Sequence, residues 1–127
     1  MRVALYTRVS TDRQSDDSQL GEMREFCERR GWPRVTEYRD VISGAKFTRS
    51  GLDKLLGDVR RGRVDVVLCF KLDRLGRSLP HLAQIVGEFT AHRVALVCPS
   101  QGIDTTSLNP ASQLQLNILM AIADRTA

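Results

Sequence analysis

The sequence predicts an α/β fold, in which a mainly parallel sheet of four or five strands lies between two layers of helices. Short apolar runs typical of buried strands alternate along the chain with segments whose apolar residues recur at helical spacing. Glycine and proline residues separate the two kinds of segment. Because strands that alternate with helices pair in parallel through right-handed crossovers, we expect helices on both faces of the sheet.

Strands are predicted where apolar residues run together or alternate with polar ones. Residues 64–70 form the clearest run and are apolar enough to be buried on both faces of a sheet. The other predicted strands span residues 2–7, 34–41 and 94–98, with a short edge strand around 102–105. Residues 42–48 contain Ser and Gly and show no periodicity, which predicts a mobile loop.

The helices are predicted from their start and stop signals. The first begins near position 16 or 17 and ends at Gly31. The second begins at Ser50, which forms a capping-box-like pair with Asp53, and Gly62 ends it. A third helix carries Pro80 in its first turn, where proline is tolerated.

A last helix is predicted from about residue 110, with an apolar stripe and no terminating signal before residue 127. We therefore expect this long C-terminal helix to be cut short. The alternative is a complete domain whose final helix packs on the core.

Composition indicates one soluble domain. The 127 residues are 42% hydrophobic and 27% charged, and no apolar run approaches the ~20 residues needed to cross a bilayer. We expect a cytoplasmic protein that does not bind membranes. The three cysteines, Cys27, Cys69 and Cys98, are widely spaced among apolar neighbours, which predicts small core residues rather than disulfides or a zinc site.

The net charge of +4 suggests a polyanionic partner. Nearly all the basic residues are arginines, whose planar guanidinium binds two phosphate oxygens at once. A coding bias toward arginine is the alternative explanation, so the charge alone does not establish a nucleic-acid partner.

Two polar clusters follow predicted strands. The carboxyl ends of parallel strands line one edge of a sheet, where ligands bind. One cluster follows the first strand and the other follows the third: they comprise Arg8, Ser10, Gln14 and Gln19, and Lys71, Asp73, Arg74 and Arg77. Taken singly, Ser10 is a typical cap or turn residue and the arginines could form a solvated ion-pair patch.

Together, a hydroxyl group and several cationic side chains suit nucleophilic attack on a phosphate, because the cations stabilise charge on the phosphoryl oxygens. Such chemistry needs no metal, and the sequence shows no cluster of His and carboxylate ligands. His81 and His92 lie eleven positions apart with no carboxylate at ligand spacing, so both are predicted to be surface residues.

Three separated motifs resemble one known family. They are Tyr6-x-Arg8-Val9-Ser10-Thr11-x-x-Gln14, then Ser43-Gly44 with Arg49, then Leu72-Asp73-Arg74-Leu75-Gly76-Arg77. In this order and spacing they resemble the resolvase/invertase catalytic domain of the serine site-specific recombinases, over residues 3 to about 123. The resemblance implies a resolvase-like fold.

The resemblance also implies a role for each matching residue. Ser10 would attack the scissile phosphodiester of DNA and form a 5′-phosphoserine linkage. The phosphate clamp would comprise Arg8, Arg74 and Arg77, with Arg49 as a fourth cation. Asp73 would orient the arginines or join in proton transfer, and Gln19 would be a further catalytic residue. The supporting or DNA-contacting positions would be Tyr6, Gln14, Ser43 and Lys71.

Cleavage and rejoining through a phosphoserine ester would need neither a metal nor ATP, because the ester conserves the energy of the broken bond. The group that accepts the Ser10 proton stays open, with a neighbouring arginine or Asp73 as candidates. Two other functions also remain open: a nuclease or phosphatase that uses the same serine, and a non-catalytic dimerisation or regulatory domain.

In this family the last helix forms the dimer interface, grips the minor groove and leads to a separate DNA-binding domain. The resemblance therefore implies that residues 1–127 are a catalytic domain without its DNA-binding domain, inactive or weakly active in isolation. The expected partners are double-stranded DNA and further copies of the full-length protein, as a dimer and, in the active synapse, a tetramer. Neither the recombination site nor the choice among resolvase, invertase, transposase and integrase follows from the sequence.

Overall fold

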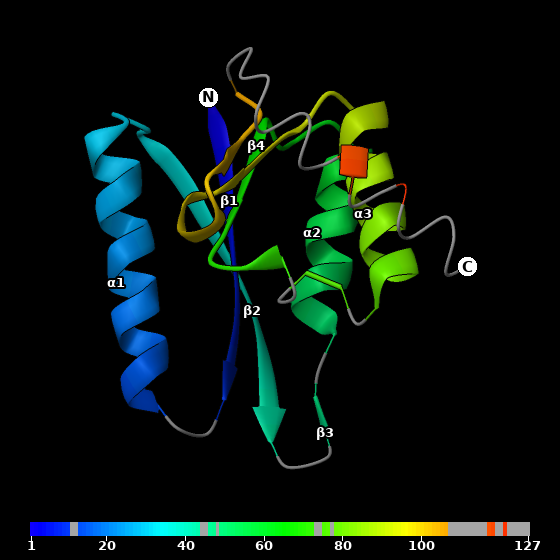
Figure 1. Cartoon of the computed structure of the whole chain (residues 1–127). Coiled ribbons are helices and arrows are strands. Elements are labelled where there is room, and N and C mark those ends of the chain that lie inside the picture. The colour runs from blue at the N-terminus through cyan, green and yellow to red at the C-terminus, as the bar shows by residue number, and fades with distance from the viewer. Residues whose placement is uncertain are drawn as a thin grey trace.

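A computed structural model describes residues 1–10, 13–43, 46–47, 49–72, 75–76, 78–106, 117–118 and 121. It shows three layers (Figure 1), with α1 (Arg13–Arg29) on one face of the sheet and α2 (Ser50–Arg60) and α3 (Leu79–Ala91) on the other. The predicted α/β fold with helices on both faces is therefore confirmed. Among the described residues, no helix has the length and apolar character needed to span a membrane.

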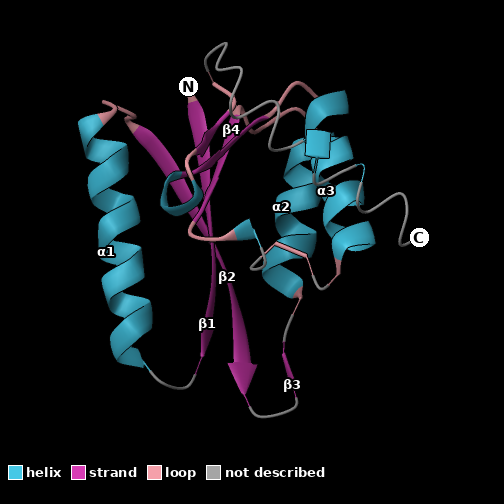
Figure 2. Cartoon of the chain, in the orientation of Figure 1, coloured by secondary structure: helices cyan, strands magenta, loops and turns pink. Residues whose placement is uncertain are grey.

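The sheet has the strand order β3-β2-β1-β4-β5-β6 over the described residues. Its centre consists of four parallel neighbours, β2, β1, β4 and β5 (Figure 2), and the two edge strands pair in antiparallel fashion. The strands are β1 (Arg2–Ser10), β2 (Arg34–Ser43), β3 (Lys46–Phe47), β4 (Val66–Cys69), β5 (Ala95–Cys98) and β6 (Ile103–Asp104).

The predicted edge strand around 102–105 is confirmed as β6, whereas the predicted loop at 42–48 is wrong in part. β2 continues to Ser43, and Ile42 pairs with Phe47 across a short hairpin that creates β3. A strand of two residues is too short to show a two-residue alternation, so the pattern could not reveal it. The sheet consequently has six strands rather than four or five.

The helices follow their predicted signals closely. α1 begins at Arg13, a few residues before the predicted start, and the chain leaves it at Gly31 with a φ of +69°. Gly62 follows α2 with a φ of +70°, and Pro80 lies in the first turn of α3. The predicted last helix, from about residue 110, lies almost wholly outside the described residues.

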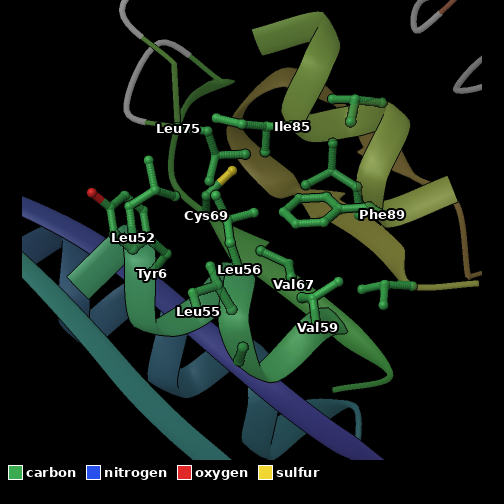
Figure 3. Packing of buried hydrophobic residues seen from close by; sticks show 14 of the residues in the cluster. Tyr6, Leu52, Leu55, Leu56, Val59, Val67, Cys69, Leu75, Ile85 and Phe89 are labelled. Carbon is green, nitrogen blue, oxygen red and sulfur yellow. The ribbon is translucent and has the colours of Figure 1, made fainter. Parts of the chain in front are cut away.

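Alternation along β1 divides the core in two. Val3 and Leu5 pack with Met23 of α1, whereas Ala4 and Tyr6 pack in a larger cluster against α2 and α3. Figure 3 shows part of this larger cluster, with side chains from the sheet and from both helices packed together. The prediction that the cysteines are core residues is confirmed, because all three are buried: Cys27, Cys69 and Cys98.

Removing a side chain from the larger cluster tests how much this layer stabilises the fold. Leu55 of α2 is fully buried in it (Figure 3). We expect Leu55→Ala to lower the free energy of unfolding by about 2–5 kcal/mol, because it removes buried methyl groups and leaves a cavity. Lys54, its exposed neighbour on α2, provides the matched control. Urea denaturation should show a change within about 0.5 kcal/mol for Lys54→Ala, and equal losses for the two variants would contradict this packing.

Candidate active site

The strand order creates a switch point between β1 and β4. β1 leads into α1 on one face of the sheet, whereas β4 is followed by α3 on the opposite face (Figure 1). In open parallel sheets the crevice at such a point, beyond the carboxyl ends of the strands, is where ligands bind. β1 also continues past β4, since the last pair between them is Tyr6 with Cys69 and β1 ends at Ser10. The backbone of Ser10 therefore lies at this edge.

A buried carboxylate joins β1 to β2 below the edge. Asp40 is 1% exposed, and its neighbour across the parallel register is Arg8. The hydroxyl group of Tyr6 donates a hydrogen bond to Asp40 Oδ2 at 2.6 Å. Because an ionised acceptor roughly doubles the strength of a hydrogen bond, this contact fixes the Tyr6 ring in the core under the site.

The same carboxylate caps α2. Asp40 Oδ1 accepts a hydrogen bond from the Gly51 N–H at 2.8 Å, and Oδ2 accepts one from the Leu52 N–H at 2.9 Å. These N–H groups at the start of a helix have no partner within the helix, and the helix dipole favours a negative charge there. Asp40 therefore anchors the amino end of α2 to the sheet.

The predicted cap of α2 is wrong. Ser50 is its first residue, and the residue that precedes it, Arg49, makes no side-chain capping hydrogen bond. The cap comes instead from Asp40 in β2, through the approach of the helix end to the strand. Gly51 permits this approach, since a Cβ atom there would overlap the backbone of Arg39. A local Ser-x-x-Asp pattern cannot reveal a cap supplied from another strand.

The pKa of Tyr6 reports the surroundings of its hydroxyl group. Burial raises this pKa strongly above its ordinary value, and the hydrogen bond to Asp40 and the charge of Asp40 raise it further. Arg8 opposes these effects through its charge and a side-chain hydrogen bond, both of which lower the pKa. The guanidinium of Arg8 therefore lies beside the Tyr6 hydroxyl group.

Gln19 joins this group from α1. It is partly buried and lines a small cavity together with Tyr6, Arg8 and Phe70. The structure thus brings Tyr6 and Arg8 together, and Gln19 lines the same small cavity from α1, which covers the face of the sheet opposite to the Tyr6 ring. Lys71 was predicted near them, but it is exposed and its Nζ lies 5.9 Å from the centroid of the Phe70 ring.

Arg49 immediately precedes α2, the helix whose amino end Asp40 anchors. Its Nη2 atom is 3.3 Å from Nε2 of His81, in the first turn of α3. Its Nε atom is buried with no hydrogen-bond partner among the described residues. Arg49 therefore holds a buried N–H donor of the kind that an anion satisfies.

The two histidines differ from each other. His92, at the carboxyl end of α3, is exposed as predicted. His81 was predicted to be a surface residue as well, but it is only partly exposed and contacts Arg49. The prediction for His81 is wrong because α2 and α3 pack side by side, which brings positions far apart in the sequence into contact (Figure 1).

Several predicted site residues fall outside the described part of the chain. They are Asp73, Arg74 and Arg77, together with the side chains of Ser10, Gln14 and Ser43. Within the described part, Asp40 links the two predicted cations: Tyr6 connects it to Arg8, and the start of α2 connects it to Arg49. Two guanidinium groups held in this way can neutralise a phosphate group.

Comparison with known proteins identifies the family. The family model described as "Resolvase, N terminal domain" matches residues 3–126. The chain belongs to this family. It is 37% identical to the transposon Tn3 resolvase of Escherichia coli over 123 residues, which are 97% of this chain and 62% of that protein. It is 34% identical to the serine recombinase gin of Escherichia phage Mu, covering 94% of this chain and 56% of the relative.

Solved structures of the resolvase family share the fold. The N-terminal catalytic domain of TP901-1 integrase superposes with a TM-score of 0.81 at 36% identity, covering 99% of this chain and 96% of that one. A resolvase family site-specific recombinase from Streptococcus pneumoniae gives a TM-score of 0.81 at 29% identity, covering 99% and 87%. The chain is thus a serine recombinase catalytic domain of the resolvase/invertase type, and it spans about three fifths of the length of the curated relatives.

Sequence reasoning missed two residues of this resolvase-family site. Asp40 lies two positions after Tyr38 on the buried side of β2, so an acidic residue at a core position was the available signal. His81 gave no comparable signal, because its contact with Arg49 depends on how α2 and α3 pack.

Removing the Tyr6 hydroxyl group tests the Asp40 network. We expect Tyr6→Phe to lower the free energy of unfolding by about 1.5–3 kcal/mol, because a buried carboxylate loses a donor. Since the folded state raises the pKa of Tyr6, the stability linked to this group is present below the pKa of the unfolded chain, about 10, and is lost as pH rises above it. The wild type should therefore lose more stability than Tyr6→Phe between pH 9 and 11, as measured by urea denaturation across this range.

Tyr38→Phe is the matched control. The Tyr38 hydroxyl group also donates to a carboxylate, Asp58 Oδ2 at 2.7 Å. The Asp58 side chain is 15% exposed, so water can reach it, whereas Asp40 is 1% exposed. We expect a smaller loss, about 0.5–1.5 kcal/mol. A loss for Tyr38→Phe as large as that for Tyr6→Phe would show that Asp40 has no special place in the fold.

Proposed function

We propose that this domain cleaves and rejoins DNA during site-specific recombination, with Ser10 as the nucleophile and a 5′-phosphoserine ester as the intermediate. One observation carries the proposal: Asp40 binds Tyr6 of β1 and the first turn of α2, so one carboxylate ties together the segments that carry Arg8 and Arg49, near the edge of the sheet where β1 ends at Ser10. Ser10 lies two positions after Arg8 in β1. Membership of the resolvase family supports the same reaction.

The reaction is a transesterification. Ser10 Oγ attacks the phosphorus, and an Oγ–P bond forms as the P–O3′ bond breaks. The serine proton passes to a base, and the departing 3′ oxygen takes up a proton to become a free hydroxyl group. The reverse attack by a 3′ hydroxyl group restores the phosphodiester, so neither ATP nor another energy source is needed.

The arginines supply positive charge where negative charge develops. Arg8 and Arg49 are held before DNA binds, which lowers the cost of arranging them in the transition state. Arg74 and Arg77, from the loop after β4, complete the proposed clamp. Gln19 contributes an amide beside Arg8, and Gln14, Ser43 and Lys71 are proposed to contact DNA or to support these residues.

The proposed partners are double-stranded DNA and other copies of the full-length recombinase, with a tetramer as the active assembly. This assembly follows from the proposed exchange of strands between two cleaved sites, which requires one serine for each of four strands. Because the chain spans 62% of the Tn3 resolvase, recognition of a particular DNA site is assigned to the whole recombinase rather than to this domain.

A covalent adduct tests the nucleophile. We expect the wild type to form an SDS-resistant protein–DNA adduct on nicked duplexes of random sequence, because the cleaved fragment diffuses away and the ester cannot be resealed. Ser10→Ala should reduce adduct formation by at least about a thousandfold, as expected for loss of a nucleophile. Gel electrophoresis with end-labelled DNA gives the rate.

Ser18, an exposed residue of α1, is the matched control, and Ser18→Ala should form the adduct at the wild-type rate. Wild-type protein that releases 5′-phosphorylated DNA over many turnovers would favour a nuclease. Adduct formation by Ser10→Ala at the wild-type rate would overturn the assignment of Ser10.

Replacing Asp73 tests its part in proton transfer. If Asp73 accepts the Ser10 proton, Asp73→Asn should bind random duplex DNA with unchanged affinity but form the adduct about 10²–10⁴-fold more slowly. Fluorescence anisotropy measures binding and the adduct assay measures the rate. An unchanged rate would eliminate Asp73 as the base and leave a neighbouring arginine as the candidate.

A further inference from the structure

We propose that His81 is a positioning residue for Arg49: its neutral imidazole accepts a hydrogen bond from the guanidinium, and this contact makes DNA cleavage sensitive to pH. The inference rests on the proposed function, since it concerns the residue that would deliver the fourth cation. It assigns a role to a side chain that no motif of the sequence singled out.

The chemistry of the contact fixes the state of the histidine. Arg49 Nη2 and His81 Nε2 are 3.3 Å apart. A guanidinium only donates hydrogen bonds and stays charged at any physiological pH, so Nε2 must be the acceptor. Nε2 can accept only in the neutral imidazole that carries its proton on Nδ1. Arg49 therefore selects one tautomer and one protonation state of His81.

The backbone on each side of this contact is fixed by other interactions. The His81 N–H donates to Ser78 Oγ at 3.2 Å, which fixes the first turn of α3. A Cβ atom at Gly76 would overlap the backbone of Leu82, so the chain before α3 also packs tightly against this turn. Arg49 immediately precedes the helix end that Asp40 anchors. The contact thus joins two fixed backbones through two side chains.

The contact lies at a groove of about 850 Å³ between α2 and α3, lined by both residues. The other charged groups that line it are Asp53 and Arg60 from α2 and Glu88 from α3. Arg60 is already paired with Glu88 at 2.7 Å. Arg49 lies within hydrogen-bond distance of the imidazole.

Protonation of His81 would change the contact in two ways. The imidazolium has no lone pair on Nε2 and cannot accept from Arg49, and its charge repels the guanidinium. Arg49 would then lose its position relative to the phosphate. Because the guanidinium favours the neutral imidazole, the effect is expected below the pH near 6.5 at which a free histidine titrates.

The hydrogen bond can be tested without any enzymatic reaction. The chain has two histidines, so ¹⁵N NMR of the imidazole nitrogens can follow both, with assignment from His92→Gln. At pH 7.5 we expect His81 to be the neutral Nδ1–H tautomer. Arg49→Met should move the His81 titration midpoint to higher pH and leave that of His92 unchanged. An Nε2–H tautomer, or a midpoint indifferent to Arg49, would overturn the proposal.

The effect on cleavage is tested by three variants in the adduct assay. Wild-type adduct formation should fall as pH is lowered from 7.5 to 5.5, in proportion to the neutral fraction of His81 that the NMR titration gives. His81→Gln places an amide oxygen near Nε2 that accepts but does not titrate, so its rate should stay within about twofold over this range. His81→Leu, which cannot accept, should be slow at every pH, and the exposed control His92→Gln should follow the wild type.

These outcomes separate the two proposals. The proposed function stands if Ser10→Ala forms no adduct. The role of His81 is wrong if the rate of adduct formation by His81→Gln falls at low pH as much as the wild-type rate does. If the wild type and Ser10→Ala form the adduct at equal rates, the proposed function fails, and the NMR result alone decides whether Arg49 holds His81. Urea denaturation of His81→Gln and His81→Leu shows whether either variant has lost its fold.

Discussion

A carboxylate buried in a protein is costly unless its oxygens are hydrogen-bonded, and Asp40 meets this condition with donors from two other elements, β1 and α2. Tyr6 reaches it from β1, the first turn of α2 reaches it through two N–H groups, and the residue itself belongs to β2. Removing any donor would leave the charge under-satisfied in the core, so the three elements are constrained to keep one arrangement. The positions of Arg8 and Arg49 follow from that arrangement.

This constraint suits a reaction that begins with positive charge already in place. Two guanidinium groups near one another repel, and Asp40 supplies a negative charge linked to both: through Tyr6 to Arg8 and through the start of α2 to Arg49. An asparagine has a single acceptor oxygen, so it would lose at least one of these hydrogen bonds together with the negative charge. The carboxylate therefore lets the protein fold with its cations assembled, before any phosphate arrives.

The fold was largely predictable because its signals are local. Val66–Cys69 is an apolar run, and Gly31 and Gly62 end helices where a positive φ is required. The cap of α2 was not predictable in the same way, since its acceptor lies ten residues before the helix in another element. β3 was missed for a different reason, because two residues that pair at an edge carry no periodic pattern.

The site was predictable to the extent that it depends on the edge of the sheet. Arg8 and Gln19 were expected near one another because a strand and the helix that follows it meet there, and the structure places both at one cavity. Arg49 and His81 meet for another reason, the packing of two helices that share a face of the sheet. Contacts of this second kind depend on the side chains between the helices, so a sequence shows the chemical groups but not which of them will meet. A neutral acceptor beside Arg49 is informative for that reason: it orients a cation without cancelling its charge, and the full charge stays available for the phosphate.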